Sequence, residues 1–136
     1  MNFSEKWAIS NEFDIKRFHE GIYFDGLYNP YYYKDFDNDL KVELRYVPAD
    51  RWADRMMIFI GGIDQGYPKH VIATNPLEWR TVKAFIVDLI LNREDTEFKN
   101  NMMKIWNSQN KYNNVDISKF KKYYREARFS LILNND

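Results

Sequence analysis

Residues 75–92 read NPLEWRTVKAFIVDLILN, and the rest of the chain is organised around this stretch. Asn75 can cap a helix because its side-chain oxygen accepts hydrogen bonds from the free backbone N–H groups of the first turn. Pro76 then stands at the first helical position, where its missing N–H costs nothing, and Glu78 can reach back to the cap. Apolar residues follow at the spacing of one helical face: Val82, Phe85, Ile86, Leu89 and Ile90. Three more widen this stripe: Ala84, Val87 and Leu91. We therefore expect a core helix that is covered on more than one side.

The composition of the 136-residue chain indicates a single domain, residues 1–136, with an ordinary hydrophobic core. Hydrophobic residues make up 45% and aromatic residues 18%, which is enough apolar surface for a core without disulfides or metals. The chain has no cysteine, which excludes disulfides, thiolate nucleophiles and cysteine-based zinc sites. Its formal net charge is zero, which argues against a generally basic nucleic-acid-binding domain.

The N-terminal sequence MNFSEKW has neither the basic region nor the apolar run of a signal peptide. The apolar runs of the chain are too short to cross a bilayer, so we expect a cytoplasmic protein without a membrane partner. Charge is unevenly distributed. Residues 1–40 contain eight acids and four bases, whereas residues 116–136 contain five bases and three acids. Such an asymmetry can direct partners to different surfaces even when the total charge is zero.

The strand predictions centre on residues 40–47, LKVELRYV, where apolar residues alternate with mostly charged ones. This pattern is typical of an antiparallel sheet with one face in water. Residues 55–60 are expected to form a more buried strand and residues 69–74 a third. The glycines between them, at 61, 62 and 66, indicate a hairpin turn, since no phosphate-binding motif follows them. A short strand is also possible around residues 31–33.

Helices are predicted on both sides of these strands. Ser10 or Asn11 can cap a helix through Glu20, with Phe13 facing inward. Asp95 or Thr96 can cap a helix through about Ser108. Asp116 can cap a last helix, which residues 129–133 either extend or follow as a strand. The inward residues of the last helix are expected to be Ile117, Phe120, Tyr124 and Ala127. Strands and helices in separate parts of the chain predict an α+β domain, with helices packed on one face of an antiparallel sheet of three or more strands.

No catalytic or cofactor motif is present, and no cofactor or metal is expected. Asp35, Asp37 and Asp39 alternate as at the start of an EF-hand loop, but the required glycine and glutamate are missing. His70, on a predicted strand near Asp64, offers a base and a carboxylate without a nucleophile. An enzyme built on this pair is the third of three functional hypotheses, behind two kinds of binding protein.

The last predicted helix combines basic residues with tyrosines at 123 and 124. Its cations are Lys119, Lys121, Lys122, Arg125 and Arg128. Such a surface can contact phosphates and stack bases, so a small nucleic-acid-binding or regulatory protein is the alternative hypothesis. The same pattern is also typical of the solvated face of an amphipathic helix.

The stretch from Tyr23 to Asp39 holds five of the ten tyrosines together with four aspartates. Successive side chains of a strand point to opposite faces, so three adjacent tyrosines at 31–33 cannot all point inward. Exposed tyrosines are enriched at interfaces, and nearby carboxylates direct such a surface toward a basic partner. The predicted partner-binding residues are Tyr28, Tyr31, Tyr32, Tyr33, Asp35, Asp37 and Asp39. An aromatic lid over the sheet with a solvated acidic turn is the competing interpretation.

The leading hypothesis is a non-enzymatic protein-binding module. Asparagine, lysine, isoleucine, tyrosine and phenylalanine are abundant, which indicates an AT-rich genome. Phages and mobile elements often encode compact, cysteine-free chains of this size to block a host protein. We therefore expect an inhibitor of a host nucleic-acid-handling or defence protein, comparable to anti-CRISPR proteins. Its acidic, tyrosine-rich stretch would occupy a basic surface of the host protein that normally holds phosphates.

Overall fold

The predicted core helix is α2, Pro76–Leu91, in the computed structural model. The Asn75 side-chain oxygen accepts a hydrogen bond from the backbone N–H of Glu78 at 2.9 Å, which confirms the predicted cap. The Glu78 carboxylate accepts from the backbone N–H of Thr74 at 2.7 Å, so its return bond reaches one residue beyond the cap. The predicted apolar stripe is buried, whereas Leu91 at the end of the helix is 75% exposed.

The structure describes residues 4–16, 31–37, 40–47, 55–62, 70–110 and 113–134. The elements before α2 are α1 Glu5–Ser10, β1 Asp14–Lys16, β2 Tyr31–Asp37, β3 Leu40–Val47, β4 Arg55–Gly61 and β5 His70–Ala73. Those after it are α3 Thr96–Asn107, the 3-10 helix η1 Ile117–Phe120 and α4 Lys121–Asn134. Strands therefore precede the long helices, as expected of an α+β fold.

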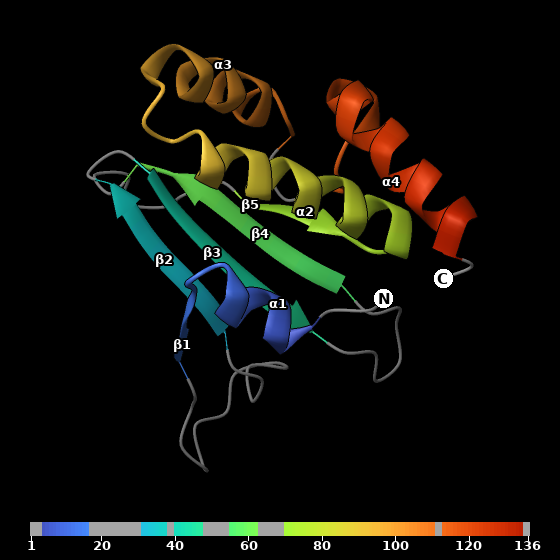
Figure 1. Ribbon diagram of the computed structural model, residues 1–136, viewed down its shortest axis with the longest axis horizontal. Helices are drawn as coiled ribbons and strands as arrows, with labels where there is room; N and C mark the ends of the chain where they lie inside the picture. Colours follow the sequence, from blue (N-terminus) through green and yellow to red (C-terminus); the bar gives the residue numbers. More distant parts are fainter. Residues whose placement is uncertain are drawn as a thin grey trace.

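The five strands in the described part of the chain form one antiparallel sheet in the order β1-β2-β3-β4-β5 (Figure 1). The predicted three-strand meander is confirmed as β3 to β5, and β1 and β2 extend it. In the register, Tyr31 lies opposite Arg45, and Arg45 lies opposite Met57. Beyond β5, the Ile72 N–H donates to the Asn113 carbonyl at 3.0 Å and the Val115 N–H donates to the Ile72 carbonyl at 2.9 Å. This parallel bridge occupies part of the backbone edge of β5.

One face of the sheet is covered by helices, as predicted. Figure 1 shows α1 and α2 lying across this face, with α3 and α4 farther out beside α2. The sheet residues beneath them are buried: Tyr32, Leu40, Val42, Leu44, Met56, Ile58, Ile60, Val71 and Ala73. Trp7 of α1 meets Trp79 of α2 edge to face at 5.7 Å, so the two helices share one core.

The outer helices pack on α2 through a cluster of rings. Phe85, which is 0% exposed, lies 4.9 Å from Phe120, 5.6 Å from Tyr123 and 6.0 Å from Trp106, between ring centroids. These partners come from η1, α4 and α3 respectively. Phe85 thus joins three elements to α2, which confirms that α2 is covered on more than one side.

The predicted helix from Ser10 or Asn11 to Glu20 is wrong over its described part. The helix is α1, which ends at Ser10, and residues 14–16 are a strand paired with β2. Glu12 adopts φ 67°, and the Glu12 and Phe13 N–H groups donate to the Ile9 and Ala8 carbonyls, which closes the helix. Phe13 is buried, as predicted, but it lies beyond the end of α1 and is not part of a helix. Its ring packs on those of Trp7 and Phe36.

The last helix begins as the 3-10 turn η1, with the Asp116 carboxylate accepting from the Ser118 N–H at 3.1 Å. Residues 129–133 extend α4, which settles the alternative left open by the sequence. The inward tyrosine is Tyr123 rather than the predicted Tyr124. The Tyr123 hydroxyl donates to the Asp88 carboxylate of α2 at 2.5 Å, which gives its polar end a partner. Burial and this carboxylate raise the pKa of Tyr123 well above its ordinary value.

Candidate functional site

The face of the sheet opposite the helices combines aromatic and charged side chains, and we call it the open face. Strand alternation places on it the residues between those buried under the helices. Its described side chains are Asp14, Tyr31, Tyr33, Asp35, Lys41, Glu43, Arg45, Arg55, Met57, Phe59, His70 and Ile72. Most are half-buried against one another, and none of the described helices covers them.

Arg45 of β3 is the centre of the open face. Its guanidinium donates from Nε and from Nη2 to one carboxylate oxygen of Glu43, at 3.1 and 2.9 Å. The same group lies 5.0 Å from the ring centroid of Tyr31 and 5.2 Å from that of Phe59. Cation–π contacts at these distances contribute about 0.5–1 kcal/mol each at partly exposed sites. Arg45 therefore links three strands and fixes the orientation of both rings.

Glu43 is nearly covered, since its side chain is only 11% exposed whereas that of Arg45 is 32% exposed. A carboxylate so far from water needs its cation, and Arg45 supplies it two residues along the same strand. The pair makes the middle of the open face rigid without giving it a net charge. A preformed, rigid surface loses little entropy when a partner docks on it.

Aromatic contacts extend from this centre in both directions. The rings of Tyr31 and Tyr33 are 5.8 Å apart on β2, and those of Phe59 and His70 are 5.1 Å apart across β4 and β5. A depression of about 250 Å³ lies beside the tyrosines. It is lined by Tyr31, Tyr33, Asp35, Lys41 and Glu43. The open face therefore offers a shallow hollow with an aromatic wall and polar groups of both signs.

The structure brings together three of the predicted partner-binding residues. Tyr31, Tyr33 and Asp35 share the open face, as alternation along β2 requires. Tyr32 is a correction, because it points into the core, where it is 5% exposed, and so cannot belong to a binding surface. Tyr28 and Asp39 lie outside the described residues, and only the backbone of Asp37 is described.

His70 lies at the β5 edge of the open face, next to Phe59 and near Arg45. Burial lowers the pKa of His70 below its ordinary value, and the Arg45 cation lowers it further. Both effects favour the neutral imidazole. Asp64, its predicted carboxylate partner, lies outside the described residues. Within the described ranges, no group of three or more His, Asp or Glu side chains is placed to hold a metal ion.

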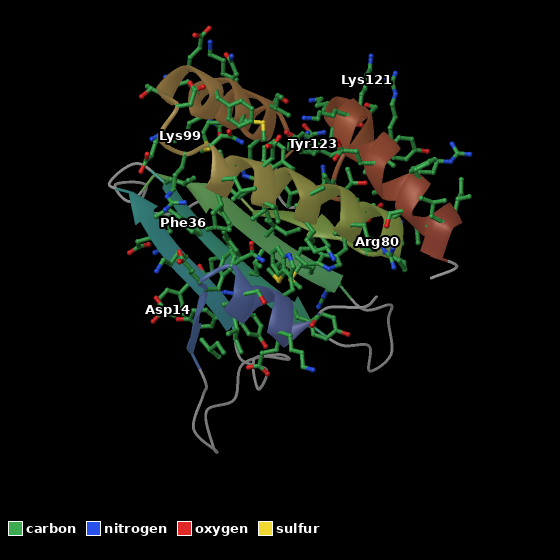
Figure 2. All side chains as sticks on the ribbon, viewed as in Figure 1. Asp14, Phe36, Arg80, Lys99, Lys121 and Tyr123 are labelled. Atoms are coloured by element: carbon green, nitrogen blue, oxygen red, sulfur yellow. The ribbon has the colours of Figure 1, made fainter. Side chains whose placement is uncertain are left out.

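All five predicted basic residues on η1 and α4 are exposed, and Lys119, Lys121 and Lys122 line one hollow. Lys122 lies 3.7 Å from the Asp88 carboxylate, and the Lys119 ammonium donates to the Ser108 carbonyl at 2.6 Å. Both are therefore held against the rest of the protein. Lys121 also lines a second groove along α4, together with Tyr124, Arg125 and Arg128. Figure 2 shows Lys121 projecting away from the body of the protein at the start of α4.

Arg45, Glu43 and Phe59 were missed as site residues by the sequence argument. For Glu43 and Arg45, the local signal was the alternation of charged residues along the clearest predicted strand, 40–47. That alternation places them on one face, but it does not show which neighbouring strand meets it. The register Tyr31–Arg45–Met57 supplies the missing information, and it is set by the packing of the opposite, apolar face.

Comparison of the chain with protein-family models, with curated proteins and with solved structures finds no match. None of the helices in the described part of the chain has the length and apolar character needed to cross a membrane.

Proposed function

We propose that this protein is a non-enzymatic protein-binding module whose partner docks on the open face. The supporting observation is the cluster of half-buried rings fixed by Arg45 on a sheet face that no described helix covers. Tyrosine and arginine dominate the binding energy of protein interfaces, because rigid rings bury a large area and their polar ends keep hydrogen bonds. The hollow beside Tyr33 gives a partner side chain a place to enter.

A protein partner fits the charges of this face better than a nucleic acid does. A single strand that stacks on exposed rings also needs cations for its phosphates. The described open face carries as many acids as bases: Asp14, Asp35 and Glu43 against Lys41, Arg45 and Arg55. Arg45 is already bound to Glu43, so it is poorly placed to neutralise a phosphate. Balanced charge with aromatic anchors is instead typical of protein interfaces.

The narrower proposal is that the partner is a host protein with a basic surface and that binding inhibits its handling of nucleic acid. Two observations support this proposal. The carboxylates of Asp14 and Asp35 are exposed on the β1 and β2 side of the open face, and the amino-acid composition indicates an AT-rich genome. Carboxylates at the rim of an interface act mainly on the association rate. Nucleic-acid binding by η1 and α4 is the weaker alternative, since Lys122 lies beside the Asp88 carboxylate and Lys119 donates to the Ser108 carbonyl.

Site-specific photocrosslinking in extract of the native host tests the docking surface. A benzoylphenylalanine probe at Tyr33 should form a covalent adduct with one protein, and the same probe at Lys104, an exposed position on α3, should not. Excess wild-type protein should suppress the adduct, whereas excess Tyr31→Ser/Tyr33→Ser protein should not. Equal adducts from both probes, or none from Tyr33, would count against the open face as the docking surface.

The recovered partner then allows a kinetic test of the acidic rim. Asp35→Asn should lower the association rate several-fold and flatten its salt dependence, with little change in the dissociation rate. Glu94→Gln removes an exposed carboxylate away from the open face and serves as the matched control. If both substitutions have the same effect in surface plasmon resonance, the carboxylate acts only through total charge and the basic-partner proposal fails.

A further inference from the structure

The side of η1 and α4 that faces away from α2 forms a second surface, which we call the α4 outer face. A groove of about 710 Å³ runs along it. Its apolar part consists of Ile117, Tyr124, Phe129 and Ile132, and its basic part of Lys121, Arg125 and Arg128. Among the residues that the structure describes, no acidic side chain lines the groove. This surface is distinct from the open face, which lies on the far side of the sheet from α2 (Figure 1).

The apolar residues of this face are unusually accessible for a helix that is fixed to a core. Phe129 is 62% exposed, Ile132 is 68% exposed and the neighbouring Leu133 is 65% exposed. The opposite side of η1 and α4 is already packed on α2 through Phe120 and Tyr123, and Ala127 is buried on the same side. The outer residues are therefore not needed for that packing, and a contiguous exposed apolar stripe indicates a contact with another molecule.

We infer that the α4 outer face binds a short, acidic, amphipathic helix belonging to another protein. From Lys121 to Ile132 the groove follows about 16 Å of α4, which matches about three turns of a partner helix. Apolar residues of the partner, spaced three and four apart, would lie on Tyr124, Phe129 and Ile132. Carboxylates flanking them would pair with Lys121, Arg125 and Arg128.

Other occupants fit these charges and shapes less well. A second copy of the chain, related by a two-fold axis, would place the same three cations of both copies against each other. A nucleic acid would use the cations but would leave Phe129, Ile132 and Leu133 in water, since phosphates gain nothing from aliphatic groups. An anionic lipid surface would contact both the apolar and the basic part of the groove, but it would not fill the concave shape of the groove.

Selection from a phage-displayed library tests the chemistry of the occupant directly. The library consists of random peptides of about sixteen residues, long enough for a helix that spans the groove. Selection uses the full chain, with counter-selection on Arg125→Glu/Arg128→Glu. Enriched peptides should be net acidic, with apolar residues at helical spacing. Failure to enrich such peptides, or enrichment of basic or extended sequences, would overturn the inference.

Fluorescence anisotropy with the most enriched peptide then locates the contact. Arg125→Glu/Arg128→Glu and Ile132→Asp should each weaken binding by about tenfold or more. Lys104→Glu and Leu91→Asp make the same kinds of change at exposed positions on α3 and α2 and should leave the affinity within about twofold. Circular dichroism should show every variant folded, because all of these side chains are exposed. Equal loss in groove and control variants would overturn the inference.

Four further measurements separate the rival occupants and the two surfaces. If a single-stranded oligonucleotide or anionic vesicles bind more tightly than the peptide does, the inference is overturned. It is also overturned if sedimentation shows a dimer of the protein that the peptide does not dissociate. Tyr33→Ala, on the open face, should leave the peptide affinity unchanged. Loss of peptide binding in Tyr33→Ala would place the peptide on the open face and refute the α4 site, whereas the photocrosslinking result stands independently of this one.

Discussion

Replacing Phe85 with alanine should lower the free energy of unfolding by about 3 to 5 kcal/mol, as for other buried aromatic residues that leave a cavity. Phe85 is 0% exposed, and its ring contacts rings from α3, η1 and α4. The substitution therefore removes the buried ring from α2. It also removes the contacts of that ring with α3, η1 and α4. Domains of this kind have total stabilities of about 5 to 15 kcal/mol, so the loss is a large fraction of the whole.

The magnitude separates into two parts that a second variant distinguishes. Most of the loss in unfolding free energy comes from the lost burial of the ring and from the cavity that it leaves behind. The edge-on contacts with Phe120 and Tyr123 add about 0.5 to 1.5 kcal/mol each beyond burial. Phe85→Leu keeps most of the apolar volume and loses the ring geometry. It should therefore cost about 1 to 2 kcal/mol, between wild type and Phe85→Ala.

Urea unfolding followed by circular dichroism and tryptophan fluorescence measures these differences. Leu91→Ala is the matched control, because Leu91 is on the same helix but 75% exposed, and it should change stability by less than about 0.5 kcal/mol. A thermal melt should show Phe85→Ala lower by about 10 to 20 °C. A loss under about 1 kcal/mol, or one no larger than that of the control, would show that the outer helices do not pack on α2 through this ring.

Three further predictions concern single side chains. Tyr123→Phe should cost about 1 to 3 kcal/mol in a urea melt, and less when Asp88 is already alanine, because the hydroxyl then has no carboxylate to bind. Tyr33→Ala should speed dissociation of the recovered partner by about tenfold or more with little change in the association rate, measured by surface plasmon resonance. Nuclear magnetic resonance should show His70 titrating below its ordinary pKa of 6.5, and Arg45→Gln should restore part of the difference, because burial is the larger cause. Since the unfolded chain takes up that proton more readily, His70 should make the fold less stable as the pH falls through 6.5, and His70→Gln should remove this loss.

The elements that the sequence predicted correctly are those whose signal is local and periodic. The apolar stripe of α2 repeats over sixteen residues and carries its own cap at Asn75, so no distant contact is needed to identify it. The alternation in β3 is equally explicit. Alternation along β2 likewise places Tyr31 and Tyr33 on a common face once residues 31–37 are known to form a strand. The α+β arrangement follows from these two periods.

The errors arose where a distant contact chose between two acceptable local patterns. The tyrosines at 123 and 124 both fit the inward spacing of α4, and the carboxylate of Asp88 selects Tyr123. Residues 10–16 have a plausible helix start, but the left-handed turn at Glu12 and the pairing of β1 with β2 override it. Neither Asp88 nor the β2 register can be inferred from the segments themselves.

The zero net charge conceals two separate electrostatic environments. The exposed carboxylates of Asp14 and Asp35 lie at the β1 and β2 end of the sheet, whereas Lys121, Arg125 and Arg128 lie on α4 at the other end of the molecule (Figure 1). At physiological ionic strength, charges are screened beyond about 8 Å, so the exposed carboxylates at one end and the cations of α4 at the other act separately on an approaching molecule. Total charge therefore does not limit the protein to a neutral partner. It is compatible with one basic and one acidic partner held at the same time, and the uneven charge along the sequence already indicated this division.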